Sequence, residues 1–279
     1  MELLFNLRAK YYCTLEKRRL SKMKILAVGD IVGKTGIQKL KETLPEVIKE
    51  NNIDFVIVNG ENAAEGMGLT EKMYREILDL NVNVITMGNH TWGKKEIFNF
   101  IDEKPIVRPA NYARNNPGKG YDIYEVKGKK IAVINLIGRV TMGVLSENPF
   151  LIAKDIVTDI KDKTDIIIID IHAEATAEKI ALGYYLDGEV SIIFGTHTHV
   201  QTADEKILEK GTGYITDIGM TGPEKSVIGM DIEASIKRFE TSLPEKYKVA
   251  EGKGMFNSCL FEVDDNTNKV VKVERINRK

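Results

Sequence analysis

The sequence of 279 residues has little cysteine, little histidine and no long apolar run. Its two cysteines, Cys13 and Cys259, lie far apart without Cys-x-x-Cys spacing, which argues against a zinc knuckle or a disulfide framework. Such sparse cysteine fits a reducing compartment, so we expect the protein in the cytoplasm. No apolar run approaches the ~20 residues of a membrane-spanning helix, and residues 1–5 are too short an apolar stretch for a signal peptide. We therefore expect no membrane partner.

Net charge is also small. The chain has 40 Lys and Arg against 41 Asp and Glu, so its net charge of -1 gives no overall attraction to nucleic acid or anionic lipid, although a local basic site is compatible with it. Its 43% hydrophobic content suffices for a large core, and no repeat or long linker divides it.

The sequence thus predicts a single domain over residues 23–279. Residues 1–22, rich in Lys, Arg, Tyr and Leu, form an N-terminal extension that need not belong to the folded domain. They are either a basic amphipathic arm or residues upstream of an alternative start at Met23, and composition favours the second interpretation.

The few histidines are concentrated where apolar runs end. His197 and His199 follow the run at residues 190–194, and in an extended segment their spacing puts both imidazoles on one face. His90 and His172 also follow strand-like runs. A lone histidine is more often structural than a ligand, but four at matching positions indicate a metal site.

Oxygen donors occupy equivalent places. Asp30 and Glu61 each follow an apolar run, and Asn89 precedes His90 in a Gly-flanked turn. The mixed donor set is too large for one tetrahedral ion: Asp30, Glu61, Asn89, His172, His197 and His199. It suits two metals that share a bridging carboxylate, which can activate a water and clamp the oxygens of a phosphoryl displacement. Without thiolates, Mn, Fe and Zn are all compatible.

Apolar runs alternate with amphipathic patterns, which is typical of an α/β protein. Helical spacing occurs at residues 37–48, 70–80 and 150–161. Two runs around a Lys-Gly-Lys turn predict a β-hairpin that begins a second sheet, at residues 121–126 and 131–137. Final strands are expected after a polar stretch at residues 237–253, near 260–263 and 270–273.

Three further features leave alternatives. Gly33-Lys34-Thr35 resembles the end of a phosphate-binding P-loop, but the required upstream glycine would fall at Val28, so the loop is one residue too short. The loop at residues 219–226 either offers backbone amides to a phosphate or merely crosses the sheet. Glu174 and Glu178 either touch the site or lie on a solvated helix face.

The motifs together resemble the calcineurin-like metallophosphoesterase superfamily, and within it the bacterial YmdB-like phosphodiesterases. The resemblance rests on five blocks in order, spanning Met23 to the C-terminus: Gly29-Asp30-Ile31-Val32-Gly33, Asn59-Gly60-Glu61-Asn62-Ala63-Ala64, Gly88-Asn89-His90-Thr91-Trp92, His172-Ala173-Glu174-Ala175-Thr176-Ala177-Glu178-Lys179 and Gly195-Thr196-His197-Thr198-His199-Val200-Gln201-Thr202. Two departures from the superfamily, Val32 in place of a histidine and Glu61 in place of a bridging aspartate, are shared with this branch.

The resemblance implies a four-layer α-β-β-α sandwich and a phosphodiesterase that acts on cyclic nucleotides, notably 2′,3′-cyclic monophosphates. It implies two metal ions, with Fe or Mn favoured over Zn, and a catalytic His90 as proton donor. The implied ligands, with Glu61 bridging, are Asp30, Glu61, Asn62, Asn89, His172, His197 and His199. RNA-linked regulatory effects, RNA-related partners and a homo-oligomeric state are further expectations. The alternative is a non-catalytic metal- or nucleotide-binding regulator that acts through partners.

Overall fold

The computed structural model describes residues 22–246 and 248–279. The N-terminal extension expected at residues 1–22 therefore lies outside the described residues, apart from Lys22. Within the described ranges, none of the helices combines the length and apolarity that crossing a bilayer requires.

Two sheets form the centre of the molecule. The first has the strand order β2-β12-β13-β1-β3-β4-β5, with β14 paired to β13. Its strands are β1 (Lys22–Val28), β2 (Asp30–Ile31), β3 (Phe55–Asn59), β4 (Val84–Thr86), β5 (Ile106–Val107), β12 (Met220–Pro223), β13 (Gly254–Asp264) and β14 (Val270–Arg278). Neighbours from β1 to β5 run parallel, whereas β13 is antiparallel to β1. The carboxyl ends of β1, β3 and β4 therefore meet at one edge.

The second sheet has the order β10-β11-β9-β8-β7-β6. Its strands are β6 (Tyr121–Val126), β7 (Lys129–Ile137), β8 (Ile166–His172), β9 (Ile192–Thr196), β10 (Lys206–Ile207) and β11 (Gly213–Ile215). β6 and β7 form the predicted antiparallel hairpin, and β7, β8, β9 and β11 are parallel. The β-hairpin prediction is confirmed.

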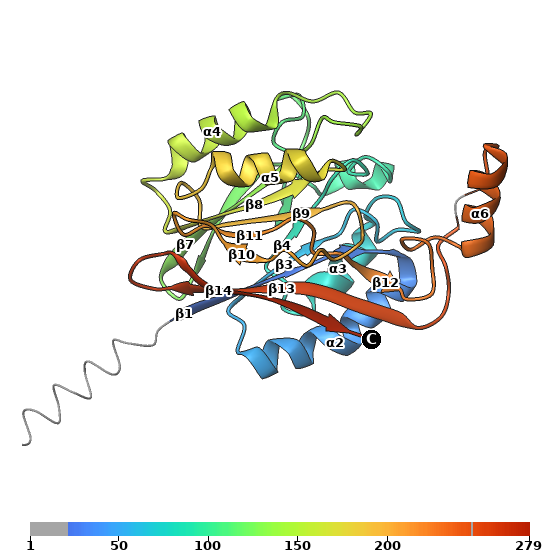
Figure 1. Cartoon of the computed structure of the whole chain (residues 1–279), viewed down its shortest axis with the longest axis horizontal. Helices are drawn as coiled ribbons and strands as arrows, with labels where there is room; N and C mark the ends of the chain where they lie inside the picture. Colours follow the sequence, from blue (N-terminus) through green and yellow to red (C-terminus); the bar gives the residue numbers. More distant parts are fainter. Residues whose placement is uncertain (1–21, 247) are drawn as a thin grey trace, which may run out of the picture.

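Helices cover the two outer faces. Figure 1 shows α4 (Pro149–Ile160) and α5 (Thr176–Tyr185) on one side of the stacked sheets and α2 (Gly33–Asn51) on the other. The helix α3 (Glu71–Leu78) packs into the same cluster as α2, and a short 3-10 helix, η1, covers Lys95–Asn99. The expected α-β-β-α sandwich is confirmed.

Strand alternation builds the layers. Along β1, Ile25 and Ala27 enter the cluster between the sheets, whereas Leu26 and Val28 enter the cluster beneath α2. β8 is buried along its whole length because sheet and helices cover both faces, which explains its unbroken apolar run.

Local signals fix the helix ends. The Thr70 side chain accepts a hydrogen bond from the Met73 amide at 3.3 Å, so α3 begins where the start signal indicates. α2 is followed by its C-cap residue Asn52, whose φ of 53° is the left-handed conformation that asparagine tolerates. The helix α6 (Ile232–Thr241) begins just before the stretch at residues 237–253 and runs into it; this helix was not predicted. In Figure 1 it stands at the rim of the sandwich.

Candidate metal centre

The polar residues predicted from strand ends come together at one edge of the sandwich. Asp30 follows β1, Glu61 and Asn62 follow β3, and Asn89 and His90 follow β4. From the second sheet, His172 is the last residue of β8, and His197 and His199 follow β9. Within each sheet these strands are parallel neighbours, and the contacts of His172 with Glu61 and of His199 with Asp30 bring the carboxyl ends of the two sheets together.

Glu61 lies at the middle of this cluster. Its Oε1 is 3.1 Å from His172 Nε2, and its Oε2 accepts the backbone N–H of His90 at 2.8 Å. Burial by itself would raise the pKa of Glu61, but the charge and hydrogen bond of His172, with those of His90, hold this pKa well below its usual range. Glu61 is thus a buried carboxylate in its ionised form.

His172 and His197 adjoin Glu61, and one donor atom from each of the three residues lies within 4.8 Å of the others. His172 Nε2 is 3.0 Å from His197 Nδ1 and 2.9 Å from Asn89 Oδ1. Burial by itself would lower the pKa of His172, but Glu61 and Asp30 raise it to about 9, whereas burial and the charge of His172 lower the pKa of His197 to about 3. His197 is therefore neutral, and a neutral imidazole keeps one nitrogen lone pair for a metal.

A second group forms around Asp30. Asp30 is fully buried, and its Oδ1 has no hydrogen-bond partner among the described residues. This oxygen is 3.8 Å from His199 Nε2 and 3.9 Å from His172 Nδ1. His199 Nδ1 donates to the Ile228 carbonyl at 2.8 Å, which leaves the lone pair on Nε2, the atom near Asp30. A buried carboxylate oxygen without a partner, beside the lone pair of His199 Nε2, fits a divalent cation.

Asn62 links the two groups. Its Nδ2 is 3.3 Å from Glu61 Oε1 and 3.1 Å from His199 Nε2, and its Oδ1 is 2.7 Å from His90 Nδ1. The His90 side chain is 31% exposed, whereas that of Glu61 is 0% exposed. His90 therefore lies between the buried cluster and solvent.

The two histidines of the Gly-x-His-x-His motif do not share one face of a strand. β9 ends at Thr196, and both His197 (φ 99°) and His199 (φ 64°) are left-handed. His197 joins the group of Glu61 and His172, and His199 joins that of Asp30. The expectation of an extended segment was wrong, although both imidazoles reach the cluster.

Of the two glutamates for which the sequence left two alternatives, Glu174 and Glu178, only Glu174 contacts the site. Glu174 Oε2 is 3.2 Å from His197 Nε2, so this carboxylate supports the ring from outside. Glu178 instead accepts backbone N–H groups of Arg139 and Val140.

Asp170, which was not predicted, lies beneath His172 and accepts the Thr196 hydroxyl at 2.7 Å. Burial raises its pKa to about 7. The sequence feature that could have predicted its role is its position as the only charged residue within the apolar run of β8.

The two phosphate-loop candidates have structural roles. Lys34 is exposed in the first turn of α2, and the Gly33 N–H donates to the Asn62 carbonyl at 3.0 Å. In the loop at residues 219–226, Met220–Pro223 form β12, whose backbone pairs with β2 and β13.

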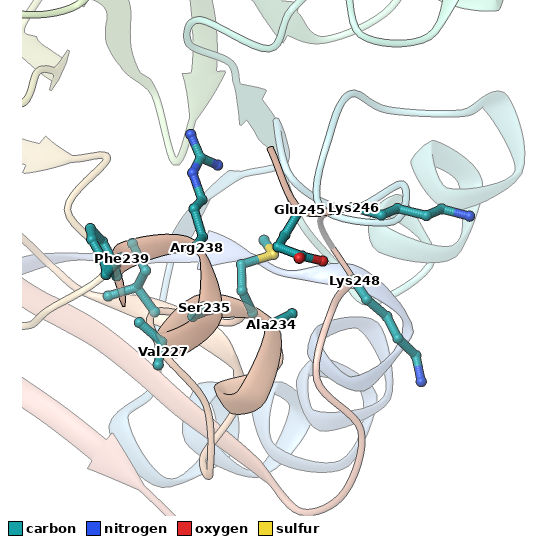
Figure 2. Close-up of a pocket in the computed structure, with 10 residues that line it drawn as sticks. Val227, Ala234, Ser235, Arg238, Phe239, Glu245, Lys246 and Lys248 are labelled. Atoms are coloured by element: carbon teal, nitrogen blue, oxygen red, sulfur yellow. The ribbon is translucent and has the colours of Figure 1, made fainter. Parts of the chain in front are cut away.

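A pocket flanks the centre on the side of His199. Ile228, whose carbonyl holds His199, lines it, together with residues of α6 and of the segment before β13. Figure 2 shows Phe239 on α6 and the basic side chains of Arg238, Lys246 and Lys248 among its lining. Glu245 lines the same pocket, so charged side chains of both signs surround a mostly apolar hollow.

A two-sheet sandwich whose parallel strands deliver carboxylates, imidazoles and amides to one edge defines a protein of the metallophosphoesterase type. Comparison with known protein families identifies the particular family. The family described as YmdB-like protein matches residues 26–276, so the chain belongs to that family. The family implies divalent metal ions at this centre.

Individual relatives agree with this assignment. The chain is 52% identical over 255 residues to the 2′,3′-cyclic-nucleotide 2′-phosphodiesterase of Bacillus subtilis (strain 168), which covers 91% of this chain and 96% of that protein. The crystal structure of a novel phosphatase from Mycoplasma pneumoniae matches with a TM-score of 0.88 and 41% identity, over 93% of this chain and 94% of the other. A putative 5′-nucleotidase from Staphylococcus aureus (TM-score 0.60, 15% identity, 92% of this chain and 54% of the other) shares the fold alone.

Proposed function

We propose that this protein is a dinuclear metal phosphodiesterase that hydrolyses 2′,3′-cyclic nucleoside monophosphates. The observation that carries the proposal is the buried Glu61, whose Oε1 lies 3.1 Å from His172 Nε2 and which Asn62 links to His199 of the second ligand group. The activity named for the 52% identical relative from Bacillus subtilis supports the choice of substrate.

The grouping of donors supports two ions rather than one. Donor atoms of Glu61, Asn89 and His197 lie 3.1, 2.9 and 3.0 Å from His172 Nε2, and these four residues would hold one ion. Asp30 and His199, with Asn62 beside them, would hold the other. Glu61 would serve both ions, since Asn62 connects its Oε1 to His199 of the second group. Two bound ions would lower the pKa of a water and neutralise charge on the phosphoryl oxygens.

The chemistry of the donor atoms limits which metals the site suits. Oxygen and imidazole donors without thiolate suit Mn, Fe or Zn, and we favour Fe or Mn on the family resemblance. We also propose a cytoplasmic location from the sparse cysteine content, while RNA-related partners and a homo-oligomeric state stay predictions.

His90 is placed to move a proton. A contact at 2.7 Å to Asn62 Oδ1 and one at 3.3 Å to Glu61 Oε1 engage its Nδ1, so the ring stands at the cluster with a partly exposed face. In the proposed reaction a water oxygen bonds to phosphorus while the bond from phosphorus to the ribose O2′ breaks. The departing alkoxide needs a proton, which His90 would supply, and the product is a nucleoside 3′-monophosphate.

This role gives the test of the function. A ribose alkoxide is strongly basic and needs protonation, whereas p-nitrophenolate departs with little help, so the two leaving groups should respond differently. We expect His90→Ala to keep most of its metal, to lose on the order of 10²-fold or more in turnover of a 2′,3′-cyclic nucleotide, and to lose markedly less with bis-p-nitrophenyl phosphate.

The measurements are steady-state turnover on both substrates and elemental analysis of the purified variant. Wild-type protein that carries metal yet turns over no cyclic nucleotide contradicts the proposed function. Equal losses on both substrates with intact metal would mean that His90 stabilises phosphoryl charge, and equal losses with depleted metal would make it a ligand.

A further inference from the structure

A fully buried ion pair lies directly behind the turn that carries His197 and His199. Lys179 on α5 and Asp217 after β11 are both 0% exposed, and Lys179 Nζ is 2.8 Å from Asp217 Oδ2. Removing charges from water is unfavourable, and a buried pair is often no more stabilising than apolar residues of the same volume. Stability alone therefore does not explain it.

The hydrogen bonds of the pair converge on the residues beside the two histidines. Asp217 Oδ2 accepts the Thr198 N–H at 3.1 Å and the Thr198 hydroxyl at 2.7 Å. Lys179 Nζ donates to the carbonyl of Thr196 at 2.7 Å. The residue between the histidines and the residue before them are thus both held by one ion pair.

This turn needs such support. His197 and His199 are both left-handed, a conformation that residues with a Cβ rarely adopt and that persists only where the surroundings fix it. Gly195 allows the close approach of the Lys179 stem, because a Cβ there would lie 2.8 Å from Lys179 Cδ and 1.9 Å from the Thr216 carbonyl oxygen. The other Asp217 oxygen, Oδ1, accepts the Gly219 N–H at 2.8 Å, which anchors the carboxylate itself.

We propose that Lys179 and Asp217 are positioning residues that hold His197 and His199 in their separate ligand groups. This inference rests on the metal-binding part of the proposed function. The pair would direct His197 toward Glu61 and His172, and His199 toward Asp30, although neither Lys179 nor Asp217 is itself one of the proposed ligands.

Two substitutions test this positioning role, one by removing the charge of the pair and the other by removing a single hydrogen bond to it. Asp217→Asn keeps the shape but removes the charge and replaces one of the two accepting oxygens by an amide NH2 group. Thr198→Val removes one hydroxyl bond at a half-buried position, and Thr198→Ser restores it. Asp204→Asn is the matched control, since Asp204 accepts from Thr202 and from Thr216 at 2.5–3.2 Å in the same region without contacting the histidine turn.

The measurements are calorimetric titration of the metal-stripped protein with Mn²⁺ and thermal unfolding of the metal-free protein. We expect Asp217→Asn to bind Mn²⁺ on the order of 10–100-fold more weakly, as for lost support of other ligands, with a smaller loss for Thr198→Val. Thr198→Ser and Asp204→Asn should bind as wild type does.

Folded Asp217→Asn and Thr198→Val variants with wild-type Mn²⁺ affinity overturn the proposal, as does an equal loss in Asp204→Asn. If Asp217→Asn does not fold, the pair of substitutions at Thr198 decides. The Mn²⁺ titrations contain no substrate. A protein that binds Mn²⁺ but hydrolyses no cyclic nucleotide would therefore contradict the proposed function, while the Mn²⁺ affinities of the variants would still test the positioning role.

Discussion

Gly88, which precedes the Asn89-His90 pair, has no room for a side chain. A Cβ there would lie 2.4 Å from His172 Cδ2 and 2.5 Å from Glu61 Oε2. The backbone is held in place, since the Gly88 carbonyl accepts the Thr91 hydroxyl at 2.6 Å and the Tyr112 hydroxyl at 3.3 Å. In Gly88→Ala the two ligand side chains must therefore retreat, each by about 1 Å, to reach ordinary contact distance.

We expect Gly88→Ala to weaken metal binding on the order of 10–100-fold and turnover by about 10²-fold, because a displacement of this size matters at a reacting centre. Overpacking should also destabilise the fold by about 1–3 kcal/mol. The measurements are metal titration, turnover of a 2′,3′-cyclic nucleotide and thermal unfolding.

The control is Gly183→Ala on α5, where a Cβ would lie 2.8 Å from the ring of Tyr214, away from the cluster. It should lose stability and keep metal affinity. Gly88→Ala with wild-type metal affinity and turnover would refute the reasoning, since the crowding would then be absorbed elsewhere.

Two further predictions concern charge at the centre. Because Glu61 adjoins both ligand groups, Glu61→Ala should lower the metal content found by elemental analysis more than His172→Ala does; full metal occupancy would remove Glu61 from the bridge. Burial raises the pKa of Asp170 in the folded protein to about 7, whereas an aspartate in the unfolded chain has a pKa of about 4. The stabilisation that the protonated carboxyl gives the folded protein is therefore fully present below a pH of about 4 and is lost as pH rises through 7. The unfolding temperature of the metal-free protein should consequently fall between pH 5 and 8 less steeply in Asp170→Asn than in wild type, and equal slopes would contradict the assignment.

Much of the fold was predictable because local patterns and layer packing agree. The unbroken apolar run of β8 required cover on both faces, and α4 and α5 on one side with the first sheet on the other supply it. The hairpin of β6 and β7 followed from two apolar runs around a Gly-containing turn. The helix α6 escaped prediction because charged residues surround its apolar stripe of Ile232, Ile236 and Phe239, so that the sequence there looks polar; in the structure this stripe lies outside the core, with Ile236 57% and Phe239 81% exposed.

The predicted centre depended on which residues stand at strand ends, and this is a property of sequence order. Its supporting residues do not share that property. Asp217 and Lys179 come from a loop and a helix far apart in sequence, and Lys179 looks like a solvated helix residue in the sequence alone. Only the folded structure shows that the Lys179 ammonium group is buried, because the face of α5 that carries Lys179 packs against the end of β9.

The spacing of His197 and His199 shows how a correct site can follow from a wrong local geometry. Alternation in a strand would aim both rings at one point, and two ligands on one ion would leave Asp30 with no imidazole lone pair beside it. The left-handed turn instead separates them, so that His197 Nδ1 lies 3.0 Å from His172 Nε2 while His199 Nε2 lies 3.8 Å from Asp30 Oδ1. One short segment thereby supplies an imidazole to each of the two groups that adjoin Glu61. Strand periodicity predicts convergence, but the division of the two imidazoles between two ligand groups depends on two backbone angles that tertiary contacts hold.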